Sequence, residues 1–234
     1  MKNLKLAAVC LSCLTMTGCS ALNFSVEGLI NAPKLTSEQS EIHQALIESV
    51  GSNITLKYPK NGEYRSAYVI ANIDDEPTDE AMVFYEYTSN GSEEDGLRVN
   101  ILDKDEDGKW YSVKELAGAG TDIDQVIISP MGSNNQTDVF VGYQNLTNDE
   151  KTMEIYSYTD GDFKRVALDT YSVLEPLDIN NDGYIELITI QRSTNNDTGA
   201  VTAKASMLNM KNNEITRGES VDMCDNVTSY VSSK

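Results

Sequence analysis

The sequence predicts an all-β protein: an open, partial β-propeller of about three four-stranded antiparallel blades, preceded by one N-terminal helix. Two observations lead to this fold class. From residue 53 onward, short apolar runs alternate with polar residues and end at turn residues, which is typical of half-buried strands. These runs recur in three units that begin near residues 68, 124 and 171. Four antiparallel strands repeated every roughly 50 residues describe a propeller blade.

The first 18 residues indicate a signal peptide rather than part of the fold. Lys2 and Lys5 precede an apolar stretch that is too short to span a bilayer. The segment Met16–Cys19, MTGC, resembles a bacterial lipobox. That resemblance implies cleavage before Cys19, lipidation of its thiol (palmitate among the acyl chains) and anchoring to the bacterial cell membrane on its extracytoplasmic side. The alternative is an ordinary secretory signal in which the cysteine is incidental.

The cysteines are consistent with export but predict no disulfide. Cys10 and Cys13 lie in the segment that would be removed, and Cys19 would carry lipid. Only Cys224 then remains as a free thiol, so no intrachain disulfide is expected in the mature protein.

A tether and a helix are expected to connect the anchor to the strands. Residues 19–35 contain the lipidated cysteine and the tether, and residues 36–51 are predicted to be helical. Thr36 can cap this helix, and Gly51 ends it. An apolar stripe at helical spacing supports the assignment. The stripe consists of Ile42, Ala45, Leu46 and Val50.

The partial propeller is predicted over residues 52–234. A closed propeller needs about four to eight blades, and an arc of three leaves two open edges. The chain is therefore expected to be a truncated propeller or one that closes by association, and the strand at Ile54–Tyr58 is a candidate for completing the last blade. The expected blades cover about 66–121, 122–170 and 171–225, and a fourth starts at 226–234.

The third unit carries the strongest motif, DINNDGYIEL at residues 178–187. With the repeated units, this motif resembles the FG-GAP or VCBS-type repeats of integrin alpha-chain propellers and of many bacterial surface proteins. The resemblance covers roughly residues 66–234. The Phe-Gly-Gly-Ala-Pro signature of the eukaryotic members is absent, so the resemblance implies the bacterial branch. The order of helix, strand and blades is also similar to that of a group of anchored bacterial lipoproteins of unknown function.

The same motif has the spacing of a calcium loop. Calcium takes six to eight oxygen ligands, and a loop can supply them from positions 1, 3, 5, 7 and 9. Gly183 at position 6 permits the bend that such a loop requires. The alternative is a metal-free turn, because Asp-Gly is an ordinary turn dipeptide. The predicted ligands of a structural calcium ion are Asp178, Asn180, Asp182, Glu186 and the backbone carbonyl of Tyr184.

Other acidic segments are weaker candidates. The first unit offers a second, weak metal site in which Pro77 replaces the glycine and must change the bend. The equivalent loop of the second unit has only Asp138 and is expected to bind nothing. The segment Asp103–Gly108 resembles the start of an EF-hand loop, but its place between strands predicts a hairpin turn. The weak metal site consists of Asn72, Asp74, Glu76 and Glu80.

Charge and motif content narrow the function. The formal net charge is −19, which disfavours nucleic acid as a partner. No GxSxG, HExxH or phosphate-binding glycine motif is present, and His43 is the only histidine. The leading hypothesis is a non-catalytic, lipid-anchored binding or adhesion module for an extracellular protein or glycan. The alternatives are an envelope enzyme that acts on glycans or peptides with carboxylates at the propeller mouth, and a non-functional truncated remnant.

Overall fold

The computed structural model divides the chain between Thr36 and Ser37 into two units. All helices and strands that it describes lie in the second unit. The signal peptide, Cys19 with most of its tether, Asn180 and the start of a fourth blade lie outside the described residues. The structure describes residues 35–88, 96–131, 137–145, 150–179, 181–211 and 214–223.

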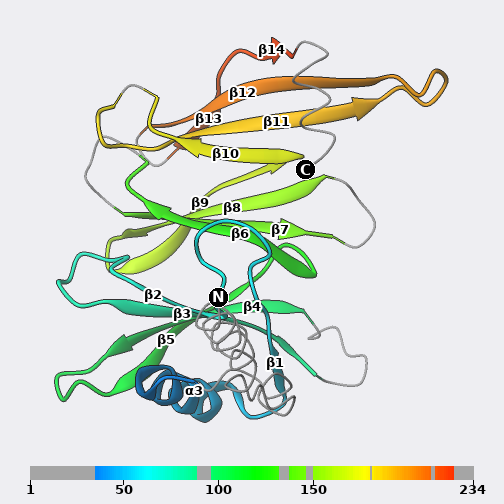
Figure 1. Ribbon diagram of the computed structural model, residues 1–234. Helices are drawn as coiled ribbons and strands as arrows, with labels where there is room; N and C mark the ends of the chain where they lie inside the picture. Colours follow the sequence, from blue (N-terminus) through cyan, green and yellow to red (C-terminus); the bar gives the residue numbers. More distant parts are fainter. Residues whose placement is uncertain are drawn as a thin grey trace, which may run out of the picture. The chain divides into compact units, whose positions relative to one another are not determined.

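The second unit is mostly β (Figure 1). It contains three antiparallel sheets of four or five strands and one N-terminal helix, which confirms this coarse part of the predicted fold. Within the described residues the sheets do not close into a ring. Each sheet is built mainly from strands that are consecutive along the chain.

The helix α3, Ser37–Val50, covers one face of the first sheet. Ile42 and Leu46, from the predicted apolar stripe, are fully buried against hydrophobic side chains of the sheet. Gly51 ends the helix with a φ of 85°, and its N–H donates to the Ile47 carbonyl at 2.9 Å. In the part of the chain that the structure describes, no helix is long and apolar enough to cross a membrane.

The first sheet contains an N-terminal strand that the sequence analysis places elsewhere. Strand β1 pairs with the end of β3, and Ile54 lies opposite Tyr87. The expectation that Ile54–Tyr58 completes the last blade is therefore wrong. Strand β3 is twice as long as β2, its other neighbour on this edge, so half of that edge of β3 is left open. The short connection after Gly51 places β1 along this open half. The strands are β1 Ile54–Leu56, β2 Tyr68–Ala71, β3 Glu80–Tyr87, β4 Leu97–Lys104 and β5 Trp110–Ala117.

The second sheet has four strands and the third has five, and both are antiparallel throughout. In the third sheet, β13 and β14 pair with different parts of the long strand β12. The second sheet consists of β6 Asp122–Ser129, β7 Asp138–Gln144, β8 Lys151–Thr159 and β9 Asp162–Tyr171. The third consists of β10 Val173–Leu177, β11 Glu186–Thr194, β12 Val201–Lys211, β13 Glu214–Arg217 and β14 Val221–Asp222.

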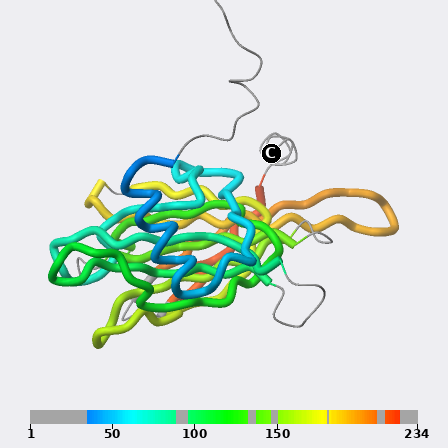
Figure 2. The backbone as a smooth tube through the Cα atoms, turned by 90° about the horizontal axis from the view of Figure 1, so that it is seen from below, coloured from blue at the N-terminus to red at the C-terminus, as the bar shows by residue number. Residues whose placement is uncertain are grey.

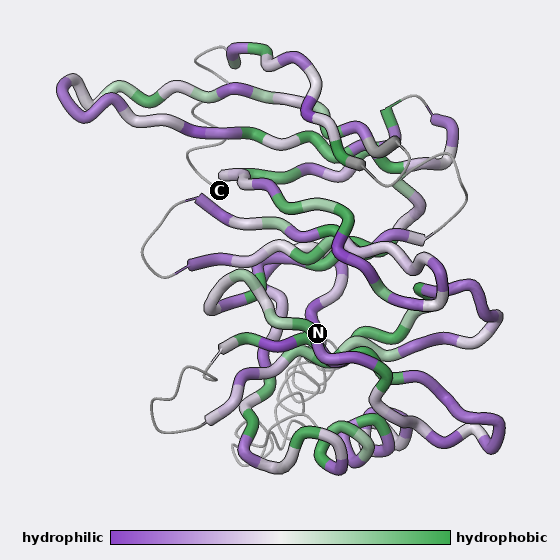
Figure 3. Tube along the Cα trace, turned by 180° about the vertical axis from the view of Figure 1, so that it is seen from behind, coloured by the Kyte–Doolittle hydropathy of each residue, from purple (hydrophilic) through white to green (hydrophobic). Residues whose placement is uncertain are grey.

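The sheets pack face to face, and the second sheet is buried on both faces. Val139 and Val141 of β7 belong to the core shared with the first sheet, whereas Phe140 between them belongs to the core shared with the third. Because successive side chains of a strand point to opposite faces, this double burial requires an almost continuous apolar run. Hydrophobic stretches accordingly follow the facing strands, and hydrophilic ones follow the turns (Figure 3).

Lysine and arginine side chains connect the outer strands of neighbouring sheets through ion pairs and hydrogen bonds. Lys114 of β5 donates to the Asp162 carboxylate and to the Phe163 carbonyl, both at 2.6 Å. Arg217 of β13 donates to the Asp169 carboxylate at 2.6 Å.

The hairpin of β11 and β12 projects beyond the neighbouring strands (Figure 2). Its inner half therefore contributes to the sheet packing, whereas its tip does not.

Candidate functional site: acidic loops and an intersheet cavity

The acidic loop of the third sheet connects β10 to β11 and is folded around Asp178. The backbone N–H groups of Asp182 and Gly183 donate to the two Asp178 carboxylate oxygens, each at 3.1 Å. The Asp182 carboxylate accepts from the Tyr184 N–H at 2.9 Å. Gly183 has a φ of 89°, which is the left-handed conformation that the sequence predicts for the bend. The loop thus has the expected turn, with Asn180 outside the described residues.

The donor types of this loop fit calcium, but the described carboxylates are not gathered as ligands. Asp178 and Asp182 accept from the loop's own backbone, and Glu186 accepts from the Ile179 N–H at 2.9 Å. Among the described residues, no group of three or more acidic, histidine or cysteine side chains is arranged to hold a metal ion. A calcium ion here would require these carboxylates to converge further.

The carboxylate at position 9 of each loop has a structural role in all three sheets. Glu186 closes its loop by accepting the N–H seven residues earlier, and Glu80 accepts from the Ile73 N–H at 2.8 Å in the same way. Asp138 accepts from the Met131 N–H at 3.2 Å, although its loop is otherwise without acidic residues. A carboxylate at this position therefore does not by itself indicate a metal site.

The weak site of the first sheet is organised by backbone contacts. The Asn72 amide donates to the Glu76 carbonyl at 2.6 Å and to the Thr78 carbonyl at 3.1 Å. The Asp74 carboxylate accepts from the Glu76 N–H at 2.7 Å. Glu80 is 1% exposed, and burial raises its pKa to about 7, with nearby Asp74 adding to the effect. One Glu80 oxygen, Oε1, has no hydrogen-bond partner within the described residues.

The EF-hand-like segment forms the hairpin turn that the sequence predicts. It joins β4 to β5, whose residues Lys104 and Trp110 are paired. The Asp105 carboxylate accepts from the Asp107 and Lys109 N–H groups at 3.0 and 2.9 Å. These contacts stabilise the turn. Strands flank it on both sides, instead of the two helices of an EF-hand.

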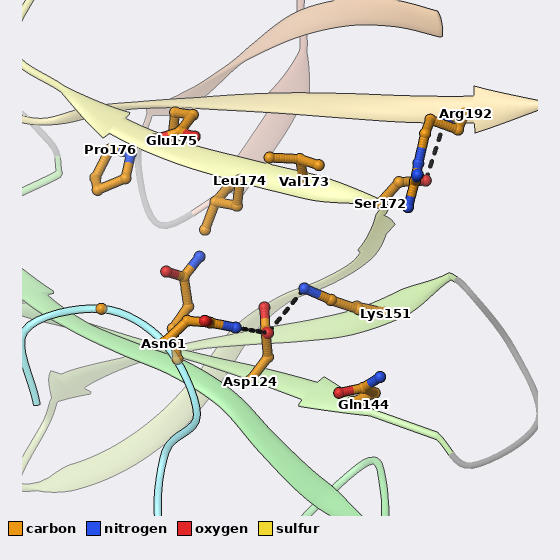
Figure 4. Close-up of a pocket in the computed structure, with 12 residues that line it drawn as sticks. Asn61, Asp124, Gln144, Lys151, Ser172, Val173, Leu174, Glu175, Pro176 and Arg192 are labelled. Carbon is orange, nitrogen blue, oxygen red and sulfur yellow. Dashed lines mark hydrogen bonds and ion pairs between the residues drawn. The ribbon is translucent and has the colours of Figure 1, made fainter. Parts of the chain in front are cut away.

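A cavity of about 690 Å³ lies between the second and third sheets, and the sequence analysis did not predict it. Its volume falls within the range of about 300–1,000 Å³ that is usual for ligand sites. Polar side chains and a short apolar strip of β10 line it (Figure 4). The lining consists of Asn61, Gly62, Asp124, Gln125, Gln144, Lys151, Ser172, Val173, Leu174, Glu175, Pro176 and Arg192.

Asp124 of β6 is the centre of the polar network in this cavity. It is 2% exposed and accepts hydrogen bonds from Asn61 at 2.7 Å, from Lys151 at 2.8 Å and from the Tyr171 hydroxyl at 2.7 Å. A buried carboxylate needs such compensation because its desolvation is costly. Burial, together with the Asp124 charge, raises the pKa of Tyr171, so its hydroxyl keeps the proton that it donates.

The segment after β1 completes one wall of the cavity. The Lys57 N–H donates to the Phe84 carbonyl in the first sheet at 2.8 Å. The Lys60 and Asn61 N–H groups then donate to the carbonyls of Ile123 and Asp124 in the second sheet, at 3.1 and 2.7 Å. This segment therefore bridges two sheets through backbone hydrogen bonds and brings the Asn61 side chain to Asp124.

Gly142 of β7 permits the close approach of Tyr171. A Cβ at this position would overlap the Tyr171 hydroxyl and would lie 3.2 Å from the Phe140 ring. The glycine is therefore needed for the position of the phenol that donates to Asp124.

One signal in the sequence points to Asp124. Asp124 stands within DIDQVIIS, next to an apolar run that forms a buried strand. A carboxylate in such a strand must be compensated by partners from elsewhere. The sequence does not identify these partners, because residues 61, 151 and 171 are far from Asp124 along the chain.

Comparison of the chain with protein-family models, with curated proteins and with solved structures finds no match. The resemblance to FG-GAP and VCBS-type repeats therefore depends on the chain's own residues. A functional proposal likewise depends on the chemistry of the loops and the cavity.

Gly142→Ala is expected to destabilise the protein by about 1–3 kcal/mol, because the added methyl group overpacks the core against Tyr171. Tyr171→Phe should cost about 1.5–3 kcal/mol through the hydrogen bond lost by Asp124. In the Tyr171→Phe background the cost of Gly142→Ala should fall, because the overlapping hydroxyl is gone. Urea denaturation of the parent, the two single variants and the double variant measures these free energies of unfolding. An equal cost of Gly142→Ala in both backgrounds would contradict the packing argument.

Proposed function

We propose that the chain is a lipid-anchored bacterial protein that displays a partial propeller as a non-catalytic binding module at the extracytoplasmic side of the membrane. Its ligand site is the cavity between the second and third sheets. A calcium ion in the third-sheet loop stiffens the same region. The cavity supports the binding part of this proposal, and sequence features support the lipid anchor and the calcium ion.

The partial-propeller proposal is supported by how the sheets are built and packed. The first two predicted units each contain four consecutive antiparallel strands, the number in a propeller blade, and the third contains five. Neighbouring sheets share hydrophobic cores, and their first strands, β6 and β10, both contribute to the cavity wall. Ligand sites of such repeat proteins are expected where several units contribute side chains.

Binding is favoured over catalysis by the state of Asp124, one of the two carboxylates that line the cavity. The alternative, an envelope enzyme acting on glycans or peptides, needs facing carboxylates that can take part in acid–base steps. Asp124 is held by three donors, one of them Lys151. The remaining lining offers amides, a hydroxyl and charged side chains, which suit hydrogen bonding to a polar ligand.

The binding proposal is tested by filling the cavity. Gln144→Trp should reduce binding to glycan or peptide arrays at least tenfold, because the larger side chain occupies ligand space. The matched control is Val113→Trp on β5, where the native valine is 50% exposed and lies outside the cavity lining. Detergent-solubilised full-length chain is the material. Equal binding by both variants and the parent, or no binding by the parent to either array, would refute the proposal.

The anchor proposal rests on the segment MTGC at residues 16–19. Cys19→Ser should abolish incorporation of a palmitate analogue when the full chain is made in a bacterial host, because the acylated thiol is removed. Cys224→Ser is the matched control, since it removes the other cysteine expected in the mature protein. Palmitate label that persists in Cys19→Ser and disappears in Cys224→Ser would show that Cys224, and not Cys19, carries the lipid.

The calcium proposal rests on the spacing and chemistry of the third-sheet loop. Side-chain oxygens of Asp178, Asn180, Asp182 and Glu186, with the Tyr184 carbonyl, would hold the ion, and the ion would stiffen the connection between β10 and β11. The first-sheet loop is a weaker candidate, because its asparagine amide donates to two backbone carbonyls.

Calorimetric titration with calcium tests this site. The parent should bind with a Kd of roughly 10⁻⁴–10⁻³ M, as extracellular calcium modules do, and Asp178→Asn should lose that binding. Asp105→Asn is the control, because it changes the hairpin turn with a similar acidic sequence. Identical calcium heats for Asp178→Asn and the parent would remove the proposed site.

A further inference from the structure

Charge pairing in the intersheet cavity is uneven. Asp124 and Lys151 neutralise each other at 2.8 Å. Arg192, in contrast, forms no ion pair or hydrogen bond through its guanidinium with any described residue, and its buried Nε atom lacks a partner. A buried donor without a partner is uncommon in folded proteins and costs free energy. The cavity lining therefore contains a guanidinium with a donor that no described residue satisfies.

Arg192 occupies one end of the cavity. It lies on β11, and its backbone N–H donates to the Ser172 hydroxyl at 3.0 Å, which fixes this part of the strand beside β10. Lys151 lies on the opposing wall, and Glu175 lies at the other end beside Pro176 (Figure 4). A ligand in the cavity would meet Arg192 at the Ser172 end.

We propose that the cavity binds a ligand through a carboxylate group and that Arg192 is the residue that binds this carboxylate. This inference rests on the proposed function of the cavity as the ligand site. The planar guanidinium matches a carboxylate in two parallel hydrogen bonds. The lining contains two cations and two carboxylates, so its formal charge is balanced, and the guanidinium offers hydrogen bonds to one carboxylate instead of an excess of charge. A protein with a net charge of −19 disfavours multiply charged anions.

The rest of the cavity suits an uncharged polar body attached to that carboxylate. Gln125 and Gln144 supply amide donors and acceptors, and Val173, Leu174 and Pro176 form an apolar strip. The same chemistry is offered by the C-terminus of a short peptide and by an acidic sugar of similar size. The shared feature is the carboxylate.

Two pairs of probes test the proposal and distinguish these sources. The first pair is N-acetyl-tripeptides with free or amidated C-termini, and the second is a glucuronic acid disaccharide and its methyl ester. Kd is measured by ligand-observed NMR with the full chain in detergent. The acid of at least one pair should bind about 10- to 100-fold more tightly than its neutral derivative, because only the acid completes the pairing of Arg192.

Variants assign the effect to one side chain. Arg192→Gln should abolish the preference for the acid, and Arg192→Lys should retain part of it through charge without the paired hydrogen bonds. Lys204→Gln, on the same sheet but outside the cavity lining, should leave the affinity unchanged. Thermal unfolding shows whether each variant is folded, and a folded Arg192→Lys keeps the test valid if Arg192→Gln unfolds.

Specific results would overturn the proposal. These are equal binding of acids and neutral derivatives, an unchanged preference in folded Arg192→Gln, or no binding of either acid at millimolar concentration. If Gln144→Trp still abolishes array binding in any of these cases, only the carboxylate proposal fails. If Gln144→Trp also has no effect, the cavity itself is not the ligand site.

Discussion

The buried Asp124 carboxylate constrains the centre of this structure. A carboxylate that is 2% exposed must be compensated, and its donors come from the segment after β1, from β8 and from β9. Satisfying this one group therefore holds three distant parts of the chain together. The same contacts form the floor of the intersheet cavity, so the requirement that stabilises the fold also shapes the candidate ligand site.

Much of the fold could be predicted from the sequence because strand burial is a local pattern. The double-faced burial of β7 requires the apolar run DVFVGYQ, and the turn residues between such runs separate the strands. The pairing of β1 could not be predicted in this way. It depends on the unequal lengths of β2 and β3, which leave half of an edge open, and three residues carry too little pattern to identify their partner.

The candidate site was only partly predictable, for a related reason. The spacing around Asp178 indicates a turn at Gly183, and the turn is present. The same spacing does not distinguish a calcium ligand from a carboxylate that closes a loop, as Asp138 does without any acidic neighbours in its loop. The cavity was not predictable, because its lining is assembled from separate segments only when the sheets pack together.

The contact between Gly142 and Tyr171 has an evolutionary consequence. A side chain at position 142 and a phenol at position 171 cannot occupy the same space, and the hydrogen bond of the phenol requires an acceptor at position 124. These three positions are therefore expected to change together among diverged relatives. A search that requires this triplet, instead of overall identity, offers a way to recognise homologues too distant for ordinary sequence comparison.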